Sequence, residues 1–282
     1  MAGEIRLIDC LHLDRPRVIG CWVVGDVLVD PGPSSCLKTV LAELGGLVPR
    51  ALLLTHIHLD HAGASGSLVR RWPHLEVYVH ERGARHLASP ERLLASAGQL
   101  WGDELERLWG EVVPVPQERL RVLRGGERLS LGGDRFEVAY TPGHASHHVS
   151  YLHGGGTAFV GDVAGVRIAP GGPVIPPTPP PDIDLEAWRA SIALISGWRP
   201  ERLAITHFGD ATEVAPHLRE LATRLDRWAE LARALPLERF EASIAAEIER
   251  AAGPEVAAAY AQAAPRGQIY AGLRRYWEKR AA

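Results

Sequence analysis

Four side chains that can bind a metal ion stand within six consecutive residues of this sequence: His56, His58, Asp60 and His61. Imidazole and carboxylate groups together suit zinc, manganese or iron. In an extended segment, residues two apart project from the same face, so His56 and His58 can bind one ion. Asp60 and His61 can reach a second ion once the chain turns toward a helix. This density of ligand-type side chains predicts a metal site.

Three further ligand-type residues, His144, Asp162 and His207, each follow the end of another predicted strand. These strands end at about residues 140, 160 and 206, and the His-rich stretch itself follows a strand over residues 51–54. Four such endings can share one edge of a layered fold. Five histidines and two aspartates are too many for one tetrahedral ion and suit two ions, each with an open position. The two carboxylate oxygens of Asp162 can bridge them.

The elements that must position these ligands alternate with turns rich in glycine and proline. Strands are predicted over residues 5–8, 18–24, 27–29, 51–54, 75–79, 120–123, 127–131, 136–140, 149–153, 157–160 and 203–206. Helical spacing of apolar residues predicts helices near residues 37–44, directly after the His-rich stretch, and after Asp182 or Asp184. Residues 170–181 are so rich in proline and glycine that we expect a stiff loop. Two interpretations, the lining of a substrate pocket and core packing, are open for four apolar residues, and core packing is favoured for each: Trp101, Trp109, and Val174 and Ile175 in that loop.

Strand signals vanish after about Gly209, and three or four helices separated by prolines are predicted from there to the C-terminus. We therefore divide the chain into residues 1–210, a catalytic domain with a helical insertion at about residues 82–117, and residues 211–282, a C-terminal helical region. These last helices are expected to pack on the sandwich or on another subunit and to cover one side of the metal edge. A homodimer through them is left open.

The motif series His56-x-His58-x-Asp60-His61, Gly143-His144, Gly161-Asp162 and His207 resembles, in order and type, that of the metallo-β-lactamase superfamily of hydrolases over roughly residues 5–209. The resemblance implies an α/β fold, the four-layer αββα sandwich with metals at one edge, here extended by the small C-terminal all-helical region. It also implies that His56, His58 and His144 hold the first metal, that Asp60, His61 and His207 hold the second, and that Asp162 bridges them. Asp30, Thr55 and His148 match polar residues that support the ligands.

The resemblance implies a metal-dependent hydrolase with two divalent ions, zinc in preference to iron or manganese. A hydroxide bridging the ions would cleave an ester-type bond in a small molecule, namely a thioester, a lactone or another carboxylic ester. Asp60 is the candidate catalytic residue, either to orient the hydroxide or to pass a proton to the leaving group. The alternatives are a mononuclear-iron persulfide dioxygenase, a phosphodiesterase and a non-catalytic metal-binding protein of the same fold. The substrate-binding residues are not assigned.

Two positions depart from the pattern of many relatives, because Ala145 follows His144 where threonine is common and His147 precedes His148 where glycine is common. This departure argues against a close match to glyoxalase II. His147 is equally consistent with a surface position. The remaining histidines are expected to be structural or solvated: His12, His74, His80, His86, His153 and His217.

The composition narrows the expected partners to a small molecule. A formal net charge of −3 offers no basic surface for nucleic acid. Three cysteines without CxxC spacing suit a reducing compartment. The first residues lack the pattern of a signal peptide, and no segment has the apolar length of a membrane span. The expectation is a cytoplasmic protein without a membrane partner.

Overall fold

Two six-stranded β-sheets form the centre of the molecule, in a computed structural model that describes residues 3–281. The first sheet has the order β1-β2-β3-β4-β5-β6 and the second the order β12-β11-β10-β9-β8-β7, so each sheet is built from one half of the chain. The first sheet comprises β1 (Ile5–Asp9), β2 (Gly20–Val24), β3 (Val27–Val29), β4 (Ala51–Leu53), β5 (Glu76–His80) and β6 (Leu120–Leu123). The second comprises β7 (Arg128–Leu131), β8 (Asp134–Tyr140), β9 (Val149–His153), β10 (Thr157–Phe159), β11 (Arg202–Ile205) and β12 (Gly209–Ala211).

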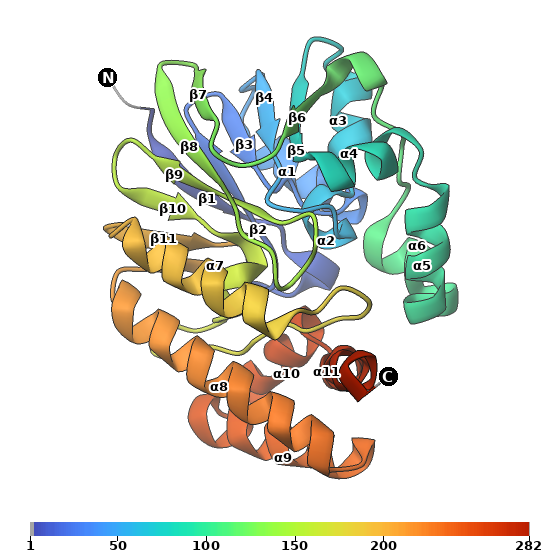
Figure 1. The fold of residues 1–282 in the computed structure, drawn as a ribbon. Helices are drawn as coiled ribbons and strands as arrows, with labels where there is room; N and C mark the ends of the chain where they lie inside the picture. The colour runs from blue at the N-terminus through green and yellow to red at the C-terminus, as the bar shows by residue number, and fades with distance from the viewer. Residues whose placement is uncertain (1–2, 282) are drawn as a thin grey trace.

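Helices lie outside the sheets and at the C-terminal end (Figure 1). The first half contributes α1 (Leu37–Glu43), α2 (Leu59–Ala62), α3 (Ser65–Arg71), α4 (Glu81–Ala88), α5 (Glu91–Trp101) and α6 (Leu105–Trp109). The second half contributes α7 (Leu185–Gly197), followed by α8 (Val214–Ala234), α9 (Leu237–Ala252), α10 (Pro254–Ala263) and α11 (Arg266–Ala281). The predicted αββα sandwich with a C-terminal helical region is confirmed.

The central strands are apolar throughout because both of their faces are buried. Val27, Val29 and Leu53 belong to the hydrophobic cluster that lies between the two sheets. Leu28 and Leu52 point the other way and belong to the cluster that the helices cover. Strands buried on both faces read as continuous apolar runs, as residues 51–54 do.

Two elements differ from the sequence prediction. The strand over residues 203–206 was expected to be the last, but β12 follows it and pairs antiparallel with β11. Glycine, aspartate and alanine are poor strand formers, so this strand depends on its neighbour rather than on its own sequence. The helix predicted directly after the His-rich stretch begins earlier, because Leu59–Ala62 is already helical and Asp60 and His61 lie on the short helix α2.

The C-terminal helices share one hydrophobic core with the sandwich. Leu221, Leu225 and Trp228 of α8 are fully buried and join the same cluster as Trp188 of α7. The indole nitrogen of Trp228 donates to the Glu247 carboxylate of α9 at 3.0 Å. None of the helices within residues 3–281 is both long and apolar enough to cross a membrane.

A buried histidine joins α8 to the turn that carries Asp162. His217 Nε2 donates to the carbonyl oxygen of Ala164 at 2.8 Å, and Ala164 lies in the 3-10 turn η5 (Gly161–Ala164). Burial lowers the pKa of His217 to about 4. Because protonation then favours the unfolded chain, this histidine contributes its full stability above about pH 6.5 and loses it between pH 6.5 and 4, at about 1.4 kcal/mol per pH unit.

We therefore expect wild-type protein to lose about 1 kcal/mol more stability than a His217→Gln variant between pH 7 and pH 5.5. Urea denaturation of both proteins in the presence of a chelator measures this difference without a contribution from bound metal. Equal losses in the two proteins would contradict the prediction.

Candidate metal centre

The structure brings all seven predicted ligands together at one edge of the sandwich. They come from the segments that follow β4, β8, β10 and β11, so both sheets contribute. The ligand atoms form three overlapping groups in which every atom lies within 4.8 Å of the others: His56, His58 and His144; His56, His61 and Asp162; Asp60, His61 and His207.

In the first group, hydrogen bonds indicate which ring nitrogens carry protons. His144 Nδ1 lies 2.8 Å from the carbonyl oxygen of Pro177 and donates to it. The Thr55 hydroxyl donates to Asp30, so it accepts from His56 Nδ1 at 3.1 Å. The Nε2 atoms of His56 and His144 thus carry lone pairs, and each lies 3.0 Å from His58 Nδ1. Burial and the neighbouring His144 lower the pKa of His58 to about 4, so this ring is neutral and can act as a ligand.

In the group formed by Asp60, His61 and His207, hydrogen-bond acceptors face one another. His61 Nδ1 donates to Asp30 at 2.8 Å and His207 Nδ1 donates to the Val18 carbonyl at 2.5 Å, so their Nε2 atoms, 3.3 Å apart, both carry lone pairs. Asp60 Oδ2 lies 3.3 Å from His207 Nε2. Asp162 Oδ1 lies 3.2 Å from His61 Nε2, is buried and has no hydrogen-bond donor within the described residues. A metal ion would satisfy all of these acceptors at once, so the residues fit one.

The neighbouring carboxylates favour positive charge on His61 and His207. Burial alone would lower the pKa of His61, but the carboxylates of Asp162 and Asp60 raise it well above its usual value. The pKa of His207 is raised in the same way, against the effect of its burial. Burial would raise the pKa of Asp162, yet His61 and His207 hold it well below its usual range. The carboxylates therefore favour positive charge at this group, which a bound metal ion would supply.

Asp30 lies where the sequence places a supporting residue. Its buried carboxylate accepts hydrogen bonds from the backbone and side chain of Thr55, from His61 and from Thr206, at 2.7–2.9 Å. These four bonds tie the segments after β3, β4 and β11 together and orient the His61 ring. His148 is buried, stacks on His56 with ring centroids 5.1 Å apart, and shares a hydrogen bond of 3.0 Å with the Thr141 hydroxyl.

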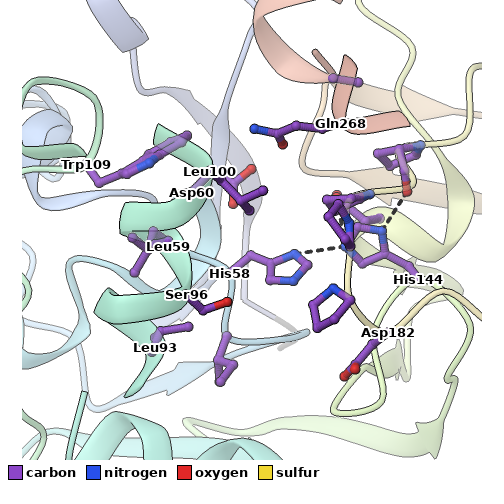
Figure 2. Close-up of a pocket in the computed structure, with 18 of the residues that line it drawn as sticks. His58, Leu59, Asp60, Leu93, Ser96, Leu100, Trp109, His144, Asp182 and Gln268 are labelled. Atoms are coloured by element: carbon purple, nitrogen blue, oxygen red, sulfur yellow. Dashed lines mark hydrogen bonds and ion pairs between the residues drawn. The ribbon is translucent and has the colours of Figure 1, made fainter. Parts of the chain in front are cut away.

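A pocket of about 800 Å³ opens beside these ligands. Figure 2 shows α5 presenting Leu93, Ser96 and Leu100 toward His58, with Gln268 of α11 on another side. The proline-rich segment contributes residues 177–182, and α10 and the residues that follow it contribute residues 262–265. The C-terminal helices therefore help to enclose the candidate site.

Sequence reasoning missed several residues of this pocket. His12 and His86, expected to be structural or solvated, line it, as do Trp101 and Trp109, for which core packing was favoured over a position in the pocket lining. His147 also lines it and is half-buried, with its ring centroid 5.6 Å from that of His58. Its place between His144 and His148 was a signal for this position. Val174 and Ile175 are fully buried in the core, as expected.

The fold and the ligand arrangement agree with a family assignment from sequence comparison. A sequence model described as the metallo-beta-lactamase superfamily matches residues 15–207. The chain therefore belongs to the metallo-beta-lactamase superfamily.

Among its relatives is the metallo-beta-lactamase fold-containing protein ST1585 of Sulfurisphaera tokodaii, 30% identical over 205 residues, which cover 70% of this chain and 75% of that protein. The crystal structure of ST1585, described as an archaeal protein from Sulfolobus tokodaii, superposes with a TM-score of 0.73 at 25% identity, covering 98% of this chain and 99% of that one.

One further relative by sequence and one by structure match smaller parts of the chain. A hydroxyacylglutathione hydrolase of Yersinia enterocolitica is 30% identical over 135 residues, which cover 46% of this chain and 41% of that enzyme. The match thus spans less than half of that enzyme's length. The structure of TTHA1623 in a di-iron-bound form has a TM-score of 0.54 and 31% identity, covering 71% of this chain and 89% of that one.

Proposed function

We propose that this protein is a dinuclear metal hydrolase that cleaves a thioester or a related carboxylic ester in a small molecule. The observation that carries the proposal is the convergence of seven ligand groups in which the buried Asp162 Oδ1 lacks a hydrogen-bond donor. Two relatives support it. One is named as a hydrolase of hydroxyacylglutathione, and the other has a di-iron-bound form.

The distances are consistent with the ligand assignment that the family resemblance implies. His56, His58 and His144 would hold the first ion, and Asp60, His61 and His207 the second. Asp162 lies between the groups, because its Oδ2 is 3.4 Å from His144 Nε2 while its Oδ1 is 3.2 Å from His61 Nε2. Each oxygen of this carboxylate therefore faces one group, as a bridging ligand requires. Zinc is the proposed metal, since histidine and aspartate without cysteine suit its catalytic sites.

When bound, two divalent cations supply Lewis acidity, which lowers the pKa of water and neutralises negative charge on the reacting carbonyl oxygen. The protein's own groups do the rest. The Asp60 side chain is 19% exposed, against 5% for Asp162, so Asp60 is the ligand carboxylate that can reach a water molecule and a leaving group in the pocket. We assign it the role of accepting and passing on a proton. Asp30 holds the His61 ring in the orientation that presents Nε2 to the site.

Purified protein is expected to contain two divalent metal ions per chain and to hydrolyse thioesters in a panel of thioesters, lactones and carboxylic esters. Treatment with a chelator should abolish the activity, and added zinc should restore it. One iron per chain with oxygen uptake on a persulfide would instead identify a mononuclear dioxygenase. Stoichiometric metal without activity on the panel or on a phosphodiester would identify a metal-binding protein without this catalysis.

A further inference from the structure

The pocket has two chemically different ends on either side of the ligands. One end lies next to His58, where the neighbouring His147 contacts α4. A Cβ atom added to Gly83 of α4 would lie 3.7 Å from His147 Cβ. This helix and the start of α5 bring three arginines to the pocket lining: Arg82, Arg85 and Arg92.

Glu81 and Asp182 line the pocket together with the three arginines, so three positive and two negative side chains leave a net charge of one positive unit here. Glu81, beside the arginines, pairs instead with Arg124 at 2.7 Å, and Asp182 accepts a hydrogen bond from the Ser146 hydroxyl at 2.5 Å. Arg85 contacts the His86 ring and Arg82 lies over the Tyr140 ring, and both of these partners are uncharged. Within residues 3–281, none of the three arginines forms an ion pair with a carboxylate. An anionic group can bind here without displacing an existing partner.

The opposite end is aromatic and rigid. The Trp109 ring stacks on His12 with centroids 5.3 Å apart, and Trp101 meets it edge-on at 5.3 Å. His12 is fixed because its Nε2 donates to the Leu108 carbonyl at 2.9 Å while its Nδ1 accepts from Gln262 at 3.1 Å. Three segments far apart in the chain thus meet here, and Trp101 and Leu100, which are less buried than Trp109 and His12, contribute the apolar lining.

This aromatic end lies on the side of the group formed by Asp60, His61 and His207. His12 lies close enough to Asp60 and His207 for their charges to act on its pKa, which burial lowers. Trp109 and Leu100 line the same pocket as Asp60 (Figure 2). The pocket volume of about 800 Å³ can hold a substrate that extends past the ligands in both directions.

We propose that the pocket selects a thioester or ester with an apolar group on one side of the scissile bond and an anionic group, a carboxylate or phosphate, on the other. This inference rests on the proposed function. Because Asp60, which passes the proton, lies at the aromatic end, the leaving thiol or alcohol is the apolar part and the acyl group carries the anion. Hydrolysis breaks the acyl C–S or C–O bond, joins the oxygen of water to the acyl carbon and returns a proton to the leaving group.

The test compares matched thioesters on the metal-loaded protein. S-octyl monothiosuccinate carries a carboxylate, its succinamide analogue is neutral, the S-ethyl analogue lacks the apolar chain, and a 3-phosphonopropanoyl thioester distinguishes phosphate from carboxylate. We expect kcat/KM for the preferred anion to exceed that of the neutral analogue about tenfold, a modest ratio because exposed ion pairs are weak. The octyl thioester should exceed the ethyl thioester by at least about tenfold, since each buried methylene contributes roughly threefold to fourfold.

Variants separate the two ends. Arg85→Ala combined with Arg92→Ala should remove the preference for the anion and keep the preference for the octyl chain, whereas Trp101→Ala should do the reverse. Arg128→Ala, an exposed arginine of β7 outside the pocket lining, is the matched control and should change neither ratio. Equal kcat/KM for anionic and neutral thioesters, or the same ratios in all variants, would overturn the inference while leaving hydrolysis established.

Calorimetry with a non-hydrolysable thioether analogue of S-octyl monothiosuccinate measures the binding affinity of the pocket without requiring turnover. Binding that weakens about tenfold in the double arginine variant, without hydrolysis of any thioester, would keep the two-ended pocket and reject the proposed function. Absence of both binding and hydrolysis would reject both.

Discussion

An Asp60→Asn variant is expected to lose about 100-fold to 10,000-fold in kcat/KM, the range typical for loss of a group that transfers protons in the reaction. The substitution keeps the size of the side chain but removes the negative charge that faces His207 Nε2 at 3.3 Å. It thereby removes both a proposed ligand of the second ion and the proposed proton carrier.

The stability of this variant should change much less than its turnover. Burial and the neighbouring Asp162 carboxylate oppose the charge of Asp60, although His61 and His207 hold its pKa below the usual value. Because the lowered pKa means that the attraction to the histidines outweighs these opposing effects, removing the charge should destabilise the metal-free protein by about 1 kcal/mol, the typical size for a single substitution. Kinetics, metal analysis and denaturation of the same preparation measure all three quantities.

Asp103→Asn provides the control, because Asp103 is an exposed aspartate that lies outside the pocket lining. It should retain wild-type rates. If Asp60→Asn also retained wild-type rates with a full metal content, the assigned role of Asp60 would be wrong.

The parts of the site that the sequence predicts are those encoded by short-range patterns. The apolar run at residues 51–54 identifies a strand with both faces buried, and the ligand-type residues follow directly. His144, Asp162 and His207 each follow a strand in the same way. Because the strand ends that carry ligands meet at one edge of the sandwich, these local signals together imply a shared site.

The parts that the sequence does not predict depend on long-range contacts. β12 exists because residues 209–211 pair with β11, and no propensity of glycine, aspartate or alanine indicates that pairing. His12 lines the pocket only because Trp109 and Gln262, brought by the insertion and the C-terminal helices, hold its ring in place. The residues around His12 in the sequence form no motif, so they do not indicate these contacts.

The contact between α11 and the proline-rich segment connects the C-terminal helices to a proposed ligand. Gly272 of α11 lies so close to this segment that an added Cβ atom would be 2.0 Å from the Thr178 carbonyl oxygen. The Thr178 hydroxyl donates to the Ile269 carbonyl at 2.9 Å. The adjacent Pro177 carbonyl accepts the hydrogen bond that orients His144, at 2.8 Å. A displacement of the backbone at residues 177–178 would therefore move the carbonyl group that orients His144.

Gly272→Ala is expected to destabilise the protein by about 1–3 kcal/mol, the usual cost of overpacking, because the Thr178 backbone must move. Metal affinity should fall about 10-fold or more, as it does when a group that orients a ligand is lost. Gly98→Ala is the matched control, since Gly98 lies within α5 and an added Cβ there meets nothing within 4 Å. That variant should gain up to about 1 kcal/mol from helix propensity and bind metal normally. Denaturation and chelator competition measure both effects. A Gly272→Ala protein as stable and as metal-avid as the Gly98→Ala protein would show that α11 does not control the position of His144.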